Sequence, residues 1–328
     1  MCGENLFLGT ENDMGKILDR TEFSDKLRKI VTEGRLLEQE PMAKHTTFRV
    51  GGAAEWFAYI DSVDILKKAI RLCKQSEIPY HIVGNGSNLL VSDSGMEGVV
   101  MRLAGEFESY ELNEIVPEGI CHVTAGAGVM LSRLALAVGK KGFTGLEFAS
   151  GIPGTLGGGV LMNAGAYGGE IKDTLVAVEI LDKNGKVKRL EKEKLKMSYR
   201  HCILQETGEI VLRAFFQLTI RPKIQISVEM DSYKKARQEK QPLEYPSAGS
   251  TFKRPEGYFA GKLIQDAGLS GHRIGGAMVS TKHAGFVINA GEATATDVYQ
   301  LIRHIQKTVE ERFGVTLEPE VRLLGEFS

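Results

Sequence analysis

Cysteine is scarce in this sequence and follows no spacing that would build a metal site or a disulfide framework. The four cysteines, at positions 2, 73, 121 and 202 of 328 residues, include no Cys-x-x-Cys pair. Such scatter argues against zinc fingers and against disulfide-rich secreted folds. The His, Asp and Glu residues show no metal-ligand spacing either, so we predict no metal site.

The sequence also lacks a surplus of charge and a long apolar run. There are 41 Lys and Arg residues and 42 Asp and Glu residues, a net charge of -1. This balance gives no electrostatic footprint for nucleic acid or for an anionic membrane. No stretch approaches the roughly 20 apolar residues of a membrane span, and no signal peptide pattern begins the chain. We expect a cytoplasmic protein that binds neither nucleic acid nor membrane.

The standard nucleotide-binding fingerprints are missing as well. Residues 84–89, GNGSNL, have Leu where a dinucleotide-binding fold needs its third glycine. Neither 139–141 nor 261–263 has the flanks of a phosphate loop of the GxxxxGK[ST] type. A simple Rossmann fold, a kinase and an ATPase are therefore disfavoured.

What the sequence does have is glycine, concentrated in three loops. Residues 150–170 carry eight glycines and one charged residue, Glu170. Two more glycine-rich turns, at 83–93 and 124–134, each follow a short apolar run. Backbone amides of such loops can hold a pyrophosphate, although glycine can also serve close packing of strands and helices. Three such loops together favour a nucleotide cofactor.

Apolar periodicity predicts the main helices and strands. Helices are expected over residues 23–31, 63–76, 130–141, 258–267 and 297–313, and strands over 80–83, 175–181, 186–190, 209–220, 285–289 and 317–324. Thr294 and Asp297 form a capping-box-like start for the last helix, and Gly314 ends it. Residues 224–241 are expected to form a strand that leads into a basic helix.

Seven motifs occur in an order that identifies a family. They are HTTFRVGG (45–52), GNGSNLLVSD (84–93), the segment 150–170, SYRHC (198–202), SAGSTFKRP (247–255), KHAGFVINAG (282–291) and LEPEVRLLGE (317–326). In this order they resemble the UDP-N-acetylenolpyruvoylglucosamine reductases, flavoenzymes of peptidoglycan precursor synthesis and so of cell-wall growth. The resemblance runs from about residue 40 to the end.

The resemblance implies an α+β fold with an FAD-binding domain in two lobes, of the vanillyl-alcohol oxidase type. This domain would span residues 21–222, with its second lobe from about 98, after an N-terminal extension at 1–20. A C-terminal α+β substrate-binding domain would span 223–328. No inserted loop with a substrate-clamping tyrosine separates Arg200 from Pro222, which resembles the compact second subclass of the family.

The reaction implied is hydride transfer from NADPH to FAD, and then to C3 of the enolpyruvyl ether of UDP-N-acetylglucosamine. A proton delivered to C2 completes UDP-N-acetylmuramate. Arg200, Ser250 and Glu320 match the catalytic positions of the family. Arg200 would stabilise the developing enolate, and Ser250 would protonate C2. Glu320 would share a proton with the substrate carboxylate or orient Arg200.

The matched motifs also supply candidate binding residues. The candidate FAD contacts are Arg49, Asn85, Gly86, Ser87, Asn88, Leu89, Gly126, Gly151, Ile152, Pro153, Gly154, Gly158, Asn163 and Ala164. The candidates for the nucleotide sugar or nicotinamide are Tyr167, Lys253, Arg254, His283 and Asn289. Taken singly, each has an ordinary structural explanation as a loop, cap or solvated residue.

Two rival functions stay open at this point. Another flavin oxidoreductase on the same fold, acting on an alcohol or an aromatic substrate, would keep the glycine loops. It would have no reason to keep Arg200, Ser250 and Glu320 together. A non-catalytic sensor of nucleotide sugars would need neither Ser250 nor Glu320.

Overall fold

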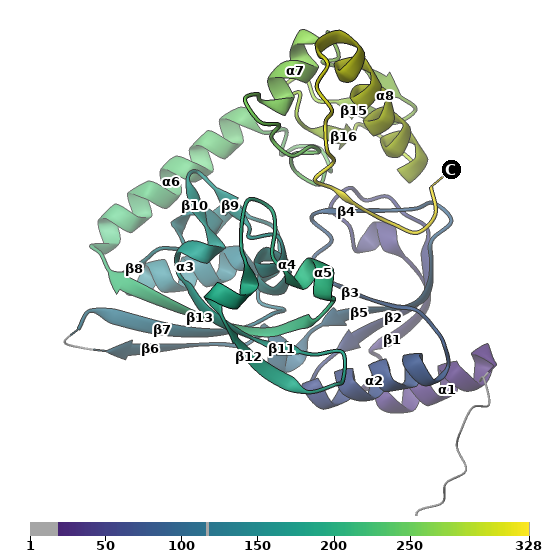
Figure 1. Cartoon of the computed structure of the whole chain (residues 1–328), viewed down its shortest axis with the longest axis vertical. Coiled ribbons are helices and arrows are strands. Elements are labelled where there is room, and N and C mark those ends of the chain that lie inside the picture. The colour runs from purple at the N-terminus through teal and green to yellow at the C-terminus, as the bar shows by residue number, and fades with distance from the viewer. Residues whose placement is uncertain (1–18, 116–117, 328) are drawn as a thin grey trace, which may run out of the picture.

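The computed structural model describes residues 19–115 and 118–327, which form a body of two lobes and a smaller C-terminal unit. In Figure 1 the lobes make up the lower part, and the C-terminal unit, residues 241–327, lies above them. The predicted N-terminal extension lies almost wholly outside the described residues. Within the described part of the chain, no helix is both long enough and apolar enough to cross a membrane.

The first lobe is a four-stranded sheet with two helices beneath it. The strands pair in the order β1 (Leu36–Pro41), β2 (Ala53–Ile60), β5 (Met96–Leu103) and β3 (Tyr80–Val83). β1 is antiparallel to β2, whereas β2, β5 and β3 are parallel. The helices are α1 (Arg20–Ile30) and α2 (Val63–Gln75), and each buries an apolar stripe in the core. The helices predicted at 23–31 and 63–76 are confirmed.

The second lobe is an antiparallel six-stranded sheet built on a long strand, β13 (Ile210–Ile220). Its order is β12 (Val187–Glu191), β11 (Leu175–Leu181), β13, β7 (Ile120–Gly126) and β6 (Tyr110–Ile115), and β8 (Phe143–Thr144) also pairs with β13. The lobe also contains α3 (Leu131–Lys141) and the short α4 (Leu156–Leu161). α3 ends at Gly142 with φ of 94°, which is the left-handed cap that glycine favours. The predicted hairpin over 175–190 and the helix over 130–141 are confirmed.

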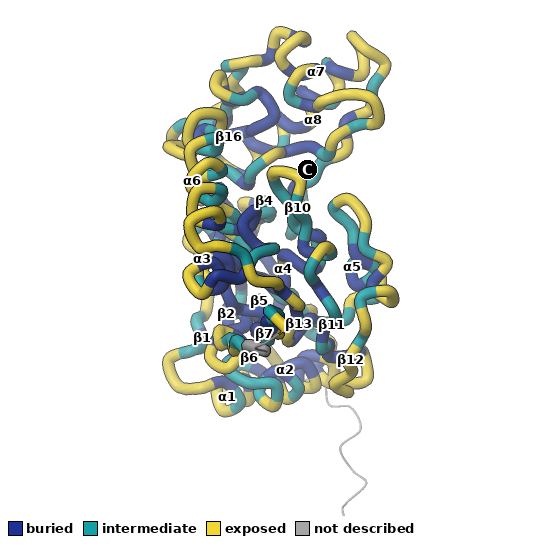
Figure 2. The backbone as a smooth tube through the Cα atoms, turned by 90° about the vertical axis from the view of Figure 1, so that its left-hand side faces the viewer, coloured by how far each residue is buried: buried dark blue, intermediate teal, exposed yellow. Residues whose placement is uncertain are grey.

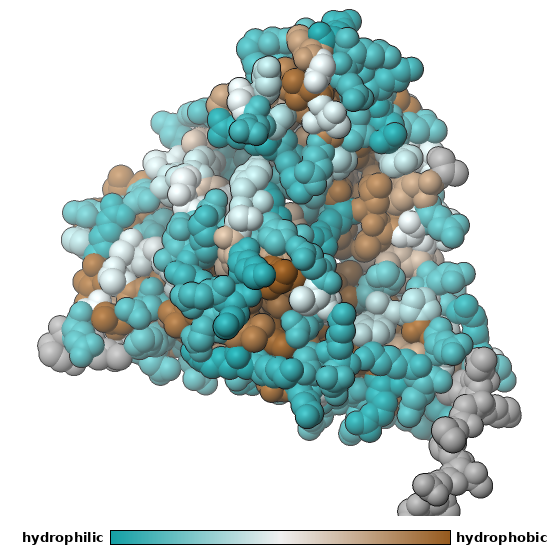
Figure 3. All heavy atoms as spheres, in the orientation of Figure 1, coloured by the Kyte–Doolittle hydropathy of each residue, from teal (hydrophilic) through white to brown (hydrophobic). Residues whose placement is uncertain are grey.

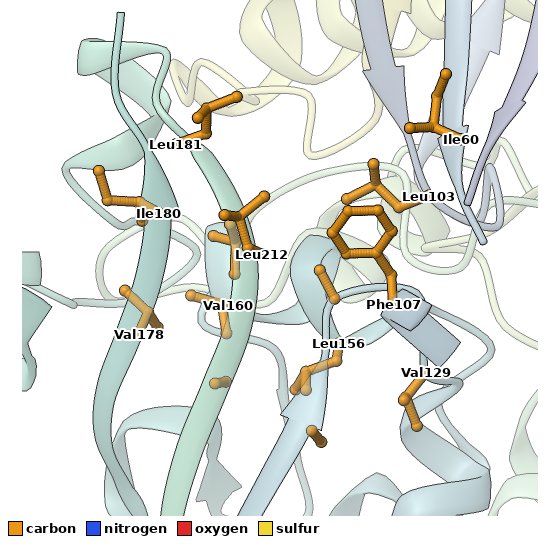
Figure 4. Packing of buried hydrophobic residues seen from close by; sticks show 14 of the residues in the cluster. Ile60, Leu103, Phe107, Val129, Leu156, Val160, Val178, Ile180, Leu181 and Leu212 are labelled. Carbon is orange, nitrogen blue, oxygen red and sulfur yellow. The ribbon is translucent and has the colours of Figure 1, made fainter. Parts of the chain in front are cut away.

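The two lobes share one hydrophobic core (Figure 4). Ile60 and Leu103 come from the first sheet, whereas Leu156 and Leu212 come from the second lobe. β5 continues through Gly98, whose φ of 76° accommodates a backbone approach so close that a Cβ would lie 2.0 Å from the Pro79 carbonyl oxygen. β5 therefore belongs to the sheet of the first lobe as far as Leu103.

Residues 223–240 form one continuous helix, α6 (Lys223–Lys240), so the strand predicted at the start of 224–241 is wrong. Ile224, Ile226 and Val228 alternate as in a strand. Only Ile226 is buried, however, whereas Ile224 and Val228 are 71% and 61% exposed. α6 rises from the second lobe toward the C-terminal unit, and Figure 2 shows most of it exposed. In Figure 3 the hydrophobic residues along this edge are scattered among hydrophilic ones.

The C-terminal unit packs two helices against a small antiparallel sheet. The strands are β14 (Arg273–Ile274), β15 (Ala277–Val279) and β16 (Val287–Asn289), and the helices are α7 (Ala260–Asp266) and α8 (Ala295–Phe313). The capping box of Thr294 and Asp297 is present, and Gly314 ends α8 with φ of 66°. Val298, Leu301, Ile302, Ile305 and Val309 form the buried apolar stripe of this helix. The helices predicted at 258–267 and 297–313 are confirmed, with small changes at their ends.

The C-terminal unit is anchored in the first lobe. Phe48, Val50 and Leu90 of the first lobe are part of the unit's own hydrophobic core. The end of the chain returns as β17 (Arg322–Leu324), which pairs in parallel with β4 (Leu89–Val91). The strand predicted over 317–324 is thus confined to its last three residues. The other predicted residues, 317–321, make only an isolated bridge between Pro319 and Phe252. The Lys253 amide donates to the Glu318 carbonyl and the Glu320 amide to the Thr251 carbonyl, both at 2.8 Å.

Asp93 of the first lobe caps the N-terminus of α8, so a substitution of Asp93 tests how much this anchoring stabilises the protein. Its carboxylate accepts hydrogen bonds of 2.8 Å from the amides of Ala295 and Thr296, and of 2.7 Å from the Thr296 hydroxyl. Burial opposes the charged form, but these hydrogen bonds outweigh it and lower the pKa of Asp93. The stabilisation is therefore present at neutral pH and is lost as the pH falls through this pKa.

We predict that Asp93→Ala lowers the free energy of unfolding at pH 7 by about 1 kcal/mol, as for the loss of a helix cap. The difference from the wild type should shrink in acid, where Asp93 is protonated in both states. Urea denaturation at several pH values measures it, with Asp231→Ala on the exposed face of α6 as the matched control. A difference that stays constant from pH 7 to pH 3 would contradict the capping role.

Candidate functional site

Three segments that are distant in sequence meet around the first glycine loop, residues 84–88. The Asn85 side chain donates to the Pro153 carbonyl at 2.7 Å, and the Thr47 amide donates to the Gly86 carbonyl at 3.2 Å. A Cβ at Gly86 would lie 2.0 Å from the His45 carbonyl oxygen, and its φ is 62°. Glycine is therefore required here for packing, and it also brings the loops 45–49, 84–88 and 151–155 together.

The amides of the same loop are open to a ligand. Among the described residues, none of the backbone amides of residues 85–88 donates a hydrogen bond to an acceptor in the chain. Successive open amides around a left-handed glycine form the concavity that binds phosphate groups. The next residue, Leu89, begins β4. Amides without an acceptor in the chain are groups that could hold the pyrophosphate of FAD.

The three glycines of α4, at positions 157–159, do not all have the same role. In α4 a Cβ at Gly157 or Gly159 would press against Ala127 or Leu131, so these two glycines serve packing. Gly158 between them is exposed, and its nearest neighbour would be the Thr155 hydroxyl at 3.7 Å. Of these three glycines, only Gly158 faces outward. Its position is suited to a cofactor contact.

The third predicted loop behaves differently. The Gly126 amide donates to the Ser109 carbonyl, and a Cβ at Gly126 would lie 2.2 Å from the Phe107 carbonyl oxygen. Gly126 therefore serves the packing of β7 against residues 105–108. The alternative reading of glycine as a packing residue, which the sequence left open, holds at this position.

Asn163 and Ala164 build the hairpin beside the site. Asn163 is completely buried, and its side chain bonds Glu170 at 2.8 Å, the Ser198 carbonyl at 2.9 Å and the Lys172 amide at 3.0 Å. The amide of Ala164 donates to Gly159, and its carbonyl accepts from Ile171. These polar groups hold β9 (Gly165–Ala166) and β10 (Gly169–Glu170) in place.

Backbone strain is concentrated at the predicted site residues. Eight described residues other than glycine have positive φ, and four of them are candidates from the sequence: Arg49 (57°), Asn163 (39°), Tyr167 (54°) and Arg200 (54°). This conformation costs free energy for residues with a Cβ, and residues that adopt it are enriched at functional sites. Arg49 itself is exposed beside the 84–88 loop.

Arg200 and Glu320 form an ion pair between the second lobe and the end of the chain. Nε of Arg200 lies 2.6 Å from Oε1 of Glu320, and its Nη2 donates to the Gly165 carbonyl at 3.2 Å. The two side chains are only 20% and 13% exposed. Burial raises the pKa of Glu320, and the nearby charges of Arg200 and Lys253 offset only part of that effect.

Ser250 lies next to this pair. The Glu320 amide donates to the carbonyl of Thr251 at 2.8 Å, so Ser250 and Glu320 lie on neighbouring segments of chain. Ser250 is exposed and follows Gly249, whose φ is 78°. The structure therefore brings the three motifs that carry Arg200, Ser250 and Glu320 side by side.

Three of the five substrate candidates surround this group. The Lys253 ammonium pairs with Glu318, and the Arg254 guanidinium lies 3.9 Å above the Phe259 ring. Tyr167, in the turn between β9 and β10, stacks on Tyr233 of α6 with ring centroids 4.5 Å apart. Aromatic faces and cations of this kind are suited to a nucleotide and its diphosphate.

The other two candidates serve the fold. Nδ1 of His283 accepts from the Gly285 amide, and the ring packs against Phe286 while burial lowers its pKa. Asn289 accepts from the amides of Gly291 and Ala293, and it donates to the Phe48 carbonyl at 3.2 Å. Asn289 therefore ties the C-terminal unit to the first lobe.

Arg237 is a site residue that the sequence reasoning missed. Its guanidinium lies 3.1 Å from the place where a Cβ of Gly151 would be, directly over the 151–154 loop. Its buried Nε has no hydrogen-bond partner among the described residues. An unpaired guanidinium above open glycines is suited to an anion. The signal was the run of basic residues after 233, which the sequence analysis assigned to a basic helix without connecting it to the site.

No three His, Cys, Asp or Glu side chains in 19–115 and 118–327 are grouped closely enough to hold a metal ion. The residues present instead fit FAD, since the open amides of 85–88, the outward Gly158 and the unpaired Arg237 lie along connected loops. Bound FAD would supply the hydride chemistry, and these residues would hold its phosphates and orient it.

Comparison with known proteins agrees with this assignment. The model of an FAD binding domain matches residues 54–191, and the model of the C-terminal domain of UDP-N-acetylenolpyruvoylglucosamine reductase matches 241–324. The reductase of Agathobacter rectalis is 52% identical over 298 residues, 89% of this chain and 95% of its own. That of Caldanaerobacter subterraneus subsp. tengcongensis is 51% identical, over 92% of this chain and 98% of its own.

A solved structure supports the same conclusion. The UDP-N-acetylenolpyruvylglucosamine reductase of Thermus caldophilus superposes with a TM-score of 0.76 at 38% identity, covering 88% of this chain and 98% of that one. The predicted fold class, a two-lobed FAD-binding domain followed by a C-terminal α+β domain, is confirmed. The chain therefore belongs to the UDP-N-acetylenolpyruvoylglucosamine reductase family and is an FAD-dependent oxidoreductase.

Proposed function

We propose that the chain reduces the enolpyruvyl ether of UDP-N-acetylglucosamine to UDP-N-acetylmuramate, with NADPH as hydride source, in cytoplasmic peptidoglycan precursor synthesis. The observation that carries the proposal is the Arg200–Glu320 pair beside exposed Ser250, where the FAD-binding lobes meet the C-terminal unit. Bound FAD would accept hydride from NADPH and pass it to C3 of the enolpyruvyl group.

Arg200 is the group that binds the substrate carboxylate. A guanidinium has five N–H donors, of which Glu320 and the Gly165 carbonyl occupy two. The remaining donors can hold both carboxylate oxygens at once. Hydride addition at C3 moves an electron pair onto C2 and that carboxylate, so a fixed guanidinium stabilises the developing enolate.

Ser250 is the group that delivers a proton to C2. Its hydroxyl is a weak acid, but the enolate carbon is basic enough to take its proton at hydrogen-bonding distance. The side chain is exposed, so water can restore the proton afterwards. The neighbouring Lys253 and Arg254 are our candidates for binding the diphosphate of the nucleotide, and Tyr167 is our candidate for stacking on an aromatic ring.

The two rival functions lose support from this geometry. An oxidoreductase for alcohols or aromatic compounds has no use for a buried ion pair that presents free guanidinium donors to a carboxylate. A sensor of nucleotide sugars would need neither the strained backbone of Arg200 nor the buried Glu320 beside it.

The first prediction for the reaction is spectroscopic. Without air, NADPH should bleach the visible flavin bands of the purified holoenzyme, and UDP-N-acetylglucosamine enolpyruvate should restore them. UDP-N-acetylglucosamine, which lacks the enolpyruvyl group, is the control for nonspecific reoxidation. A reduced flavin that the enolpyruvyl nucleotide leaves bleached would refute the proposed substrate.

The second prediction separates the two half-reactions. Ser250→Ala should leave flavin reduction by NADPH within about twofold of the wild type, while reoxidation by the enolpyruvyl nucleotide falls by roughly 10² to 10⁴. Ser247→Ala, in the same segment, is the matched control. Stopped-flow absorbance measures both rates, and an equal loss in both half-reactions would sink the proton-donor role.

The third prediction concerns the protonation of Glu320. As a carboxylate, Glu320 orients Arg200, so reoxidation should slow as the pH falls through its pKa. Because burial raises that pKa, this acid limb should lie above the ordinary glutamate value of about 4.3. Glu320→Gln should be slower and should lack the limb. If the glutamine variant instead removes an alkaline limb, the protonated carboxyl is the working form.

A further inference from the structure

Gln205 makes an unusual set of contacts immediately behind the Arg200–Glu320 pair. It lies on α5 (Leu204–Thr207) in the second lobe. Its Nε2 donates to the carbonyls of Leu161 at 2.5 Å and Arg200 at 3.1 Å. Its Oε1 accepts from Nη2 of Arg322. One amide side chain therefore joins the end of α4, the Arg200 backbone and β17.

These contacts close a ring around the ion pair. The Arg200 side chain contacts Glu320, which is two residues before Arg322 in the chain. The Arg322 side chain contacts Gln205, and Gln205 holds the carbonyl of Arg200 itself. Each partner of the ion pair is thus fixed a second time, by a path that does not pass through the pair.

The same end of the chain is fixed on its other side by the 84–88 loop. Asn88 donates from its side chain to the Glu320 carbonyl at 2.9 Å, and its own carbonyl accepts from the Arg322 amide at 3.0 Å. Residues 320–322 are therefore held between the predicted pyrophosphate loop and Gln205. The position of Glu320 depends on both.

Arg200 needs such support, because its backbone is strained. Its φ is 54°, in a tight turn closed by reciprocal hydrogen bonds between Ser198 and His201 of 3.1 and 3.2 Å. A residue with a Cβ keeps this conformation only where surrounding contacts impose it. The Gln205 bond to the Arg200 carbonyl is one such contact.

We propose that Gln205 and Arg322 are positioning residues that hold Arg200 and Glu320 in the geometry needed for substrate reduction. The inference rests on the proposed function, because it assigns their effect to reoxidation by the enolpyruvyl nucleotide. Both side chains would act through Arg200 and Glu320, which they hold in place. A displacement of about 1 Å at a catalytic group costs up to roughly 10²-fold in rate, so a positioning role is measurable.

The test compares variants that remove different parts of the ring in the holoenzyme. Gln205→Ala removes all three contacts. Gln205→Glu keeps an acceptor for Arg322 but loses both donors to the carbonyls. Arg322→Lys keeps the charge, and Gln225→Ala on exposed α6 is the control for loss of a surface amide.

We expect Gln205→Ala to slow reoxidation by roughly 10- to 100-fold at saturating substrate, with little change in flavin reduction by NADPH. Reoxidation in Gln205→Glu should be nearly as slow as in Gln205→Ala. Arg322→Lys should be slowed less than either, because the lysine keeps a charged donor for Gln205. The double variant Gln205→Ala, Arg322→Ala should be no slower than Gln205→Ala alone, because both belong to one path. Gln225→Ala should behave as the wild type.

Two further readouts separate positioning from a general loss of structure. In Gln205→Ala the acid limb of reoxidation should move to higher pH, because a loosened Arg200 no longer lowers the pKa of Glu320 as strongly. Amide hydrogen exchange over 198–202 should also rise, and this measurement needs no substrate. Lower stability and FAD content with unchanged rate per flavin, unchanged acid limb and unchanged exchange would overturn the inference.

The failure of the proposed function would look different. If wild-type enzyme is not reoxidised by the enolpyruvyl nucleotide, the substrate assignment fails, while faster exchange over 198–202 in Gln205→Ala still supports the ring. If the wild type is reoxidised and every ring variant reacts at the wild-type rate, the positioning role alone fails.

Discussion

The contact between Arg200 and Glu320 is the interaction on which the rest of the site depends. It joins residues 120 positions apart, one on a strained turn of the second lobe and one on the segment that returns from the C-terminal unit. The pair is mostly buried, and removing one partner would leave the other charge without compensation. The lobes, the C-terminal unit and the returning strand must therefore all be in place before the site exists.

The glycines illustrate why one residue type supports two explanations. Gly86 and Gly98 accept backbone approaches that a Cβ would forbid, and Gly126 does the same against Phe107. The open amides of 85–88 and the exposed Gly158 have no such architectural task to perform. Packing thus shapes the loops, and the amides that packing leaves open are the ones suited to a pyrophosphate. Local sequence does not separate the two groups, because the separation depends on what lies opposite each glycine.

The sequence predicted correctly those helices whose apolar stripe and end signals all lie within the helix or next to it. α8 has an apolar stripe, a capping box and a terminal glycine, and α3 has a stripe and Gly142, so both were found. The segment 224–241 misled because Ile224, Ile226 and Val228 alternate, although only the surface opposite decides that Ile226 alone is buried. Residues 317–321 misled in the same way, since their strand-like composition meets a partner through a single bridge.

The candidate site shows the same limit, because the role of a residue depends on its partners in the folded chain. Motif resemblance supplied Arg200, Ser250 and Glu320, and it also supplied Asn163 and Asn289, whose side chains are used to hold the fold. A motif records that a residue matters without saying whether it meets the ligand or the backbone. Gln205 and Arg237 lay outside the candidate set because their significance comes from partners as far as 117 residues away. A residue that acts on substrate and a residue that positions such a residue can therefore stand in the same motif. Their side-chain partners distinguish them, and only the folded chain shows those partners.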